Sequence, residues 1–148
     1  MFYPGISIVT LAVRDVARSR AFYERVGWRS SNVASTPECA FFQLSNVALA
    51  LYDRAKFDAE RGAAPRLDSA QEEEVPRCAL AQNHGSPSSV DEALRRFVSA
   101  GGAVTKPAAA THWGGYTAIV ADPDGHLWEL AWNPAFPLNV DGSIELPP

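Results

Sequence analysis

One carboxylate interrupts an apolar stretch near the carboxyl end of the chain. Residues 127–132 read LWELAW, so Glu129 is the single ionisable side chain in that segment. Side chains alternate along a strand, which places Glu129 on the same face as Leu127 and Ala131. A carboxylate among apolar neighbours is costly unless it is hydrogen-bonded, paired, metal-bound or facing water. Glu129 is therefore our candidate general base for removing a proton beside a carbonyl, with a buried structural hydrogen bond as the alternative.

Aromatic and uncharged polar residues near the predicted strands indicate a site for a small organic ligand. Aromatic rings bury about 150–250 Å² each and stack on planar or cationic molecules. For Trp113 and Tyr116, beside the flexible glycines 114–115, ordinary packing is an equally good interpretation. Trp128 and Trp132 lie on the strand face opposite Glu129, where we expect them to pack against a helix. The candidate ligand-contacting residues are Thr10, Phe41, Gln43, Asn83, His112, Trp113, Tyr116 and Glu129.

The other potential metal ligands do not form a recognisable set. His84 and His126 fall in predicted loops, and Cys39 and Cys78 are interpreted as small buried hydrophobic residues. The spacings typical of zinc fingers, zincins, phosphate-binding loops and serine hydrolases do not occur in the sequence. A metal centre built from local motifs is therefore not predicted.

Composition excludes several classes of partner. The 148 residues carry a net charge of −4 and no basic run, which argues against nucleic acid. No apolar run approaches the roughly 20 residues that a membrane span needs, and residues 1–15 do not resemble a signal peptide. Two cysteines do not make a disulfide framework. We expect residues 1–148 to form a single cytoplasmic domain.

The first half of the chain predicts a strand, a helix and two further strands. Residues 6–13 alternate as a strand does, and Asp15 can cap a helix that runs to about Val26 and ends at Gly27. Residues 39–44 and 47–52 read as a hairpin. Residues 54–76 then read as a solvated linker that begins with a short helix, with a mobile flap over a pocket as the alternative.

The same order of elements then begins again. Residues 78–83 read as a strand, and Ser89 with Glu92 fits a capping box that starts a helix. The helix ends at Gly101, and two strands follow over 116–121 and 127–132. Matching residues of the two predicted helices are separated by one constant offset. We therefore divide the domain into repeat one (about 6–53), a linker (54–76), repeat two (77–133) and a tail (134–148).

This organisation predicts an α+β fold. Each βαβββ-type unit has an apolar sheet face that its single helix cannot cover. We expect the two tandem units to pair their sheets into a curved sheet with a concave cleft, with the helices outside. Two segments, VTLAVRDVARSRAFYERVGW and GGYTAIVADPDGHLWELAWNP, resemble the vicinal-oxygen-chelate superfamily, which contains glyoxalase I, bleomycin-resistance proteins, fosfomycin-resistance enzymes and extradiol dioxygenases.

The resemblance implies four structurally equivalent metal-ligand positions, two in each repeat. Glu129 matches the last of them, whereas the other three fall on Ile8, Ala50 and, within about one residue, Ala79. A catalytic zinc or non-heme iron site takes about three protein ligands. We therefore expect no metal cofactor, and a divalent metal only if this assignment of positions is wrong.

Three functions follow from the resemblance and the residues. The first is a metal-free protein that binds a small organic molecule in an aromatic cleft. The second is a lyase, isomerase or dioxygenase of the same superfamily, acting through Glu129 as a base or as a metal ligand. The third is a structural or partner-binding module whose cleft is filled by its own side chains. The resemblance also implies a homodimer.

Overall fold

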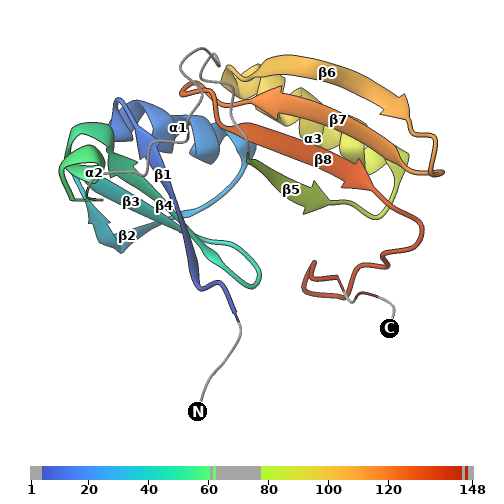
Figure 1. Cartoon of the computed structure of the whole chain (residues 1–148), viewed down its shortest axis with the longest axis horizontal. Coiled ribbons are helices and arrows are strands. Elements are labelled where there is room, and N and C mark those ends of the chain that lie inside the picture. The colour runs from blue at the N-terminus through green and yellow to red at the C-terminus, as the bar shows by residue number, and fades with distance from the viewer. Residues whose placement is uncertain (1–4, 61, 63–77, 145, 147–148) are drawn as a thin grey trace.

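Two four-stranded sheets organise the chain, in a computed structural model that describes residues 5–60, 62, 78–144 and 146. The strand order is β1-β4-β3-β2 in one sheet and β5-β8-β7-β6 in the other. Figure 1 shows the sheets side by side, with α3 behind the strands of the second. The elements are β1 (Ile8–Val13), α1 (Val16–Val26), β2 (Ser30–Thr36), β3 (Cys39–Gln43), β4 (Ala48–Asp53), α2 (Arg54–Glu60), β5 (Ala79–Asn83), α3 (Pro87–Ala100), β6 (Ala103–Ala110), β7 (Tyr116–Ala121) and β8 (Leu127–Trp132).

The two sheets repeat one pattern of pairing. In each, the first strand pairs in parallel with the last, and the last pairs antiparallel with the one before it in the chain. The tandem α+β architecture predicted from the repeated order of elements is thus confirmed. Hydrogen bonding does not join the two sheets into one, at least over the residues described. β1 and β5 are therefore both edge strands.

Helix boundaries follow from their capping residues. Asp15 precedes α1 and accepts a 2.9 Å hydrogen bond from the backbone nitrogen of Arg18, as predicted. The predicted start of the second long helix at Ser89 is wrong, because Ser86 is the N-cap and Pro87 the first helical residue. Proline is well suited to that position, since it lacks the N–H that would be left unpaired and its φ is already helical. Gly101 ends α3 at a φ of 110°, a left-handed conformation that glycine adopts readily.

Two edge strands carry no clear hydrophobic signal. β2 (SSNVAST) is polar and largely exposed, and β6 (AVTKPAAA) contains Pro107 and small residues. Both pair with their neighbours through shifted registers. Neither strand buries an alternating apolar face, so β2 and β6 are not predicted from the sequence.

A single aromatic core joins the two repeats. The rings of Phe22 in α1 and Phe97 in α3 lie 5.9 Å apart, and those of Trp28 and Trp128 lie 5.0 Å apart. Each pair has one member from each repeat, and all but Trp28 are buried. Burial of aromatic rings is among the largest contributions to a core of this size. The repeats therefore fold against each other rather than as separate domains.

The segment between the repeats is described only at its start. α2 matches the short helix predicted there, and most of the linker, residues 61 and 63–76, lies outside the described residues. The alternative prediction of a mobile flap over a pocket concerns those residues, which lie outside the part of the chain that the structure describes. None of the helices in the described ranges is long and apolar enough to cross a membrane.

Candidate functional site

A hollow of about 620 Å³ lies between the two repeats. The turn between β3 and β4, the end of β5 and residues 142–144 of the tail form its walls. These segments approach one another on the lower side of the molecule in Figure 1. Every residue lining the hollow is uncharged. Its volume falls within the range of about 300–1,000 Å³ that ligand pockets occupy.

Carboxamides and hydroxyls supply the polar groups of this hollow, which are those of Gln43, Ser45, Asn46, Gln82, Asn83 and Ser143. Gln43 ends β3, Asn83 ends β5, and Gln82 precedes Asn83, so the ends of two strands bring three of the four carboxamides to one place. The Gln43 amide nitrogen donates a 2.6 Å hydrogen bond to the carbonyl of Leu44. The side chains of Gln82 and Asn83 form no hydrogen bond with any residue that the structure describes. Their donors and acceptors are therefore available to a ligand.

Two tryptophans form the apolar wall. Trp28 stacks on Tyr23 with ring centroids 5.1 Å apart and an interplanar angle of 10°, and it meets Trp128 edge to face. The Trp128 indole nitrogen donates a 3.0 Å hydrogen bond to the Tyr23 hydroxyl. Contacts on both sides therefore fix the orientation of the wall. Trp128 was predicted to be core and is 4% exposed, whereas Trp28 was not predicted to contribute to a site.

A second hollow of about 360 Å³ adjoins the first and shares Trp28 and Gln82 with it. It lies against α3 and contains charged residues, including Glu92, which pairs with Arg96 at 3.0 Å. His84 also lines it, and the Nε2 atom of His84 is buried with no hydrogen-bond partner in the described part of the chain. Burial lowers the pKa of His84, so the ring is neutral near pH 7.

Glu129 occupies a different surface. It lies on the face of β8 that points away from α3, between Ala81 of β5 and Ile119 of β7 in the strand register. The side chain is half-buried and forms no hydrogen bond or ion pair with other described residues. Neither hollow includes Glu129 in its lining. Glu129 therefore does not share a pocket with Gln43, although Asn83 lies on the same face of the sheet as Glu129, two register rows away.

The remaining predicted residues are dispersed. Thr10 and Phe41 lie in one register row of the first sheet, on either side of Ala50. The hydroxyl of Tyr116 donates a 3.0 Å hydrogen bond to Asp91 of α3, which places this side chain on the helix side of β7 and away from Glu129. His112 and Trp113 are exposed in the loop between β6 and β7.

A Cβ placed on Gly115 would overlap the ring of Trp113, so that ring lies directly over the loop backbone. Of the eight predicted residues, the structure brings only Gln43 and Asn83 together in a hollow. Alternation along each strand fixes which face a residue takes, but the packing of one repeat on the other decides which faces meet.

The donor set does not suit a metal ion. Of the four positions that the family resemblance implies, Ile8, Ala50 and Ala79 have side chains without donor atoms. In the described ranges, no three histidine, cysteine, aspartate or glutamate side chains converge as metal ligands would. Glu129 by itself supplies too few ligands for a divalent ion, and we derive no step through a metal.

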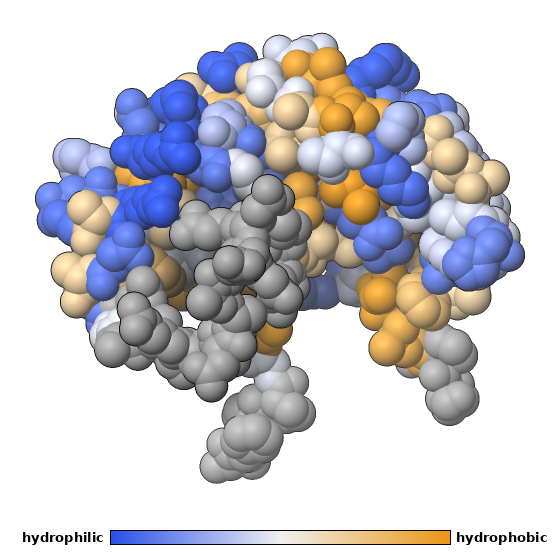
Figure 2. Space-filling view, turned by 45° about the horizontal axis from the view of Figure 1, so that its top comes forward, coloured by the Kyte–Doolittle hydropathy of each residue, from blue (hydrophilic) through white to orange (hydrophobic). Residues whose placement is uncertain are grey.

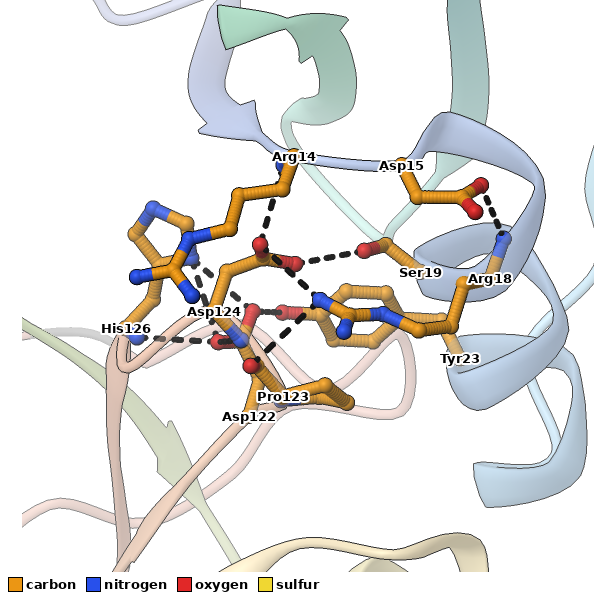
Figure 3. Close-up of polar contacts among 9 residues, drawn as sticks. All are labelled: Arg14, Asp15, Arg18, Ser19, Tyr23, Asp122, Pro123, Asp124 and His126. Atoms are coloured by element: carbon orange, nitrogen blue, oxygen red, sulfur yellow. Dashed lines mark hydrogen bonds and ion pairs between the residues drawn. The ribbon is translucent and has the colours of Figure 1, made fainter.

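A cluster of polar side chains connects the first repeat to the turn before β8 through hydrogen bonds, as Figure 3 shows. The Tyr23 hydroxyl donates a 2.6 Å hydrogen bond to Oδ2 of Asp122, and Nδ1 of His126 lies 2.9 Å from the same oxygen. Burial acts to raise the pKa of Asp122, but the bonds from His126 and Tyr23 prevail and hold it below its ordinary range. His126, predicted to fall in a loop, stabilises this turn through its contacts with Asp122.

Asp124 extends the cluster to the start of α1. Its Oδ2 accepts a 2.6 Å hydrogen bond from the Ser19 hydroxyl, and its Oδ1 accepts bonds from the backbone nitrogen of Arg14 and from the Arg18 guanidinium. The Asp124 side chain is 3% exposed, so its charge depends on these donors. The aspartates of the turn thus position one repeat on the other, and the hollows lie at the junction that they stabilise.

Comparison with known proteins agrees with this architecture. The sequence model of the Glyoxalase/Bleomycin resistance protein/Dioxygenase superfamily matches residues 5–130. The chain belongs to this superfamily. Among solved structures, a glyoxalase-related enzyme from Fulvimarina pelagi is 33% identical, with a TM-score of 0.85 over 99% of this chain and 100% of that one. No curated protein sequence matches the chain.

Other solved superfamily structures are more distant. A glyoxalase/bleomycin resistance protein/dioxygenase from Nocardioides is 27% identical, with a TM-score of 0.69 over 89% of this chain and 85% of that one. Lactoylglutathione lyase from Agrobacterium tumefaciens is 21% identical, with a TM-score of 0.63 over 88% and 95%. The lyase shares the fold, and the superfamily uses that fold for several activities. The function of this member must therefore be argued from its own side chains.

Proposed function

We propose that this superfamily member binds an uncharged, planar organic molecule in the hollow between its repeats and does so without a metal ion. The observation that carries the proposal is the lining of the hollow, where Trp28 and the carboxamides of Gln82 and Asn83, which have no hydrogen-bond partner among the described residues, border one space. Indole surface favours a flat apolar body, and a carboxamide pairs with a neutral group that both donates and accepts, such as a lactam. An ionised group would lose its hydration there without gaining an opposite charge.

The volume of the hollow favours ligand binding over a purely structural role. A structural module should fill its own cleft, whereas about 620 Å³ remains open here. We further propose that the protein acts in the cytoplasm on a small molecule, with neither nucleic acid nor membrane as a partner, and that it forms the homodimer that its family resemblance implies.

An enzymatic activity is the second candidate, and Glu129 is the observation that favours it. A half-buried carboxylate without a partner among the described residues is free to accept a proton from a bound substrate. In that case Glu129→Gln, which keeps the shape of the side chain and removes the base, abolishes turnover. Turnover that survives the substitution would exclude Glu129 as the base.

Calorimetric titration with matched probes tests the binding proposal. Quinazolin-4-one is planar, neutral and carries a lactam, and its carboxylate-bearing and ammonium-bearing derivatives keep the ring system while adding charge. We expect the neutral probe to bind at least tenfold more tightly than either charged derivative. We also expect Asn83→Ala and Trp28→Ala to weaken binding of the neutral probe, and Asn32→Ala, on the exposed strand β2, to leave it unchanged. Equal affinity for all three probes, or binding that survives both substitutions in the hollow, would overturn the proposal.

A further inference from the structure

The face of the second sheet that points away from α3 carries two opposite charges that do not pair with each other. Lys106 of β6 and Glu129 of β8 lie in one register row, with Ile119 of β7 between them. Residues in one row of antiparallel strands point to the same side of the sheet. Adjacent strands are about 4.8 Å apart, so the backbones of the two charged residues are about 10 Å apart.

A neutral group holds Lys106 in place. Its Nζ donates a 2.9 Å hydrogen bond to Oγ1 of Thr117, a side chain only 1% exposed. Lys106 forms no ion pair with any residue in the described ranges. An ammonium has three donors, and this contact uses one of them. Thr117 therefore fixes the position of the ammonium without neutralising its charge.

Glu129 is the complementary group on this face. Its neighbours in the row, Ala81 and Ile119, offer no hydrogen-bond donor from their side chains. A half-buried carboxylate in such surroundings is stabilised when a hydrogen-bond donor binds to it. Figure 2 shows hydrophobic and hydrophilic residues interspersed over the half of the molecule that contains β6 and β7, without one continuous apolar patch. This character suits a small polar ligand better than an apolar partner.

We propose that this face binds a small amino or hydroxy carboxylic acid. Lys106 receives the carboxylate, Glu129 accepts hydrogen bonds from the ammonium or hydroxyl at the other end, and Ile119 supports the short carbon chain between them. The spacing of the two charges selects molecules whose end groups are separated by several carbon atoms. This site is distinct from the uncharged hollow of the proposed function, because neither charged residue lines that hollow.

Three probes of equal chain length separate the contributions of the two charges. We would titrate 6-aminohexanoate, hexanoate and hexylamine into the full chain labelled with ¹⁵N and follow backbone amide shifts. The wild type should bind 6-aminohexanoate about tenfold more tightly than either singly charged probe, with shifts centred on Lys106, Thr117 and Glu129. Lys106→Gln should remove the preference over hexylamine, and Glu129→Gln should remove the preference over hexanoate. Thr117→Val, which keeps the shape but removes the hydroxyl, should weaken binding of both carboxylate probes.

Lys56→Gln is the matched control, since Lys56 is an exposed lysine on α2 that pairs with Glu38. It should leave all three affinities unchanged. The proposal is overturned if hexanoate binds as tightly as 6-aminohexanoate, if the preference over hexylamine survives Lys106→Gln, or if none of the probes shifts this face. Folding of each variant is checked by its amide spectrum, so that a lost preference is not confused with a lost fold. The quinazolinone titration depends on the hollow between the repeats and not on this sheet face. Either proposal can therefore fail without the other.

Discussion

The Tyr23 hydroxyl donates a 2.6 Å hydrogen bond to Oδ2 of Asp122, across the junction between the two repeats. Tyr23 belongs to the first helix, and Asp122 follows β7 in the second repeat. Both side chains are buried, and the Trp128 indole nitrogen completes the hydrogen bonding of the hydroxyl. Burial and the adjacent Asp122 carboxylate raise the pKa of Tyr23 far above its ordinary value, so the hydroxyl remains a donor at any physiological pH.

Replacing this donor should destabilise the whole domain. Tyr23→Phe keeps the ring and its stacking on Trp28, but it leaves the Asp122 carboxylate with one donor fewer and the Trp128 N–H without an acceptor. We expect a loss of about 1–3 kcal/mol in the free energy of unfolding, measured by urea denaturation.

Tyr52→Phe is the matched control for this change. The Tyr52 hydroxyl also donates to a carboxylate, that of Glu60, but it does so on the protein surface. We expect that substitution to change the free energy of unfolding by less than about 0.5 kcal/mol. If the two variants lose equal stability, the buried bond does not have the role described here.

The stability of the domain should depend on pH through His126. The hydrogen bond to Asp122 raises the pKa of His126 above its ordinary 6.5, against a smaller opposing effect of burial. Folding therefore favours the protonated ring. Its contribution is fully present below about pH 6.5 and is lost as the pH rises through the raised pKa of the folded state.

Urea denaturation at several pH values between 6 and 9 measures this dependence. We expect the stability advantage of the wild type over His126→Gln to shrink steadily as the pH increases across that range. His112→Gln, in an exposed loop, should follow the wild type. An advantage that grows with pH would show that the neutral ring is the form stabilised by the fold.

The repeat was readable from the sequence because it depends on local signals. Asp15 and Gly27 mark the two ends of α1, and strand alternation buries Trp128 and Leu130 while leaving Glu129 on the other face. Both signals are properties of short segments. The exception is the start of α3, where three serines within four residues could each act as a cap. Pro87 decides between them, since a proline at the first helical position makes Ser86 the cap.

The candidate site was less predictable, because it depends on contacts between distant segments. Gln43 and Asn83 meet across the junction of the repeats, and residues 142–144 of the tail close the hollow. No local pattern indicates that Trp28, which follows the glycine at the end of α1, both packs on the aromatic core and lines this hollow. The one available signal was a large aromatic residue directly after a helix end, where the chain turns toward the other repeat.

A glycine at the end of α3 should tolerate no side chain. A Cβ on Gly102 would lie 2.9 Å from the carbonyl oxygen of Phe97, 3.0 Å from Cγ2 of Val120 and 3.1 Å from the carbonyl oxygen of Ala121. Two of these contacts are with backbone atoms, which cannot move away without displacing α3 or β7. We expect Gly102→Ala to cost about 1–3 kcal/mol in the free energy of unfolding.

Gly85→Ala provides the comparison for Gly102→Ala. A Cβ on Gly85 would meet no atom within 4 Å, so this substitution should leave the stability unchanged or slightly increased. Thermal unfolding of the two variants under identical conditions measures the difference. A melting temperature for Gly102→Ala equal to that of the wild type would mean that α3 does not pack as closely on β7 as described.

The side-chain amide signals of the hollow give the most direct test of the proposed function. A ¹⁵N-labelled sample resolves the NH₂ groups of Gln43, Gln82 and Asn83 together with the indole N–H of Trp28, and each can be assigned from a single substitution. On titration with quinazolin-4-one we predict that these four signals shift together and saturate at one ligand per chain. Saturable binding that leaves all four signals unmoved, or no binding at millimolar probe, would contradict the account of this hollow as the ligand site.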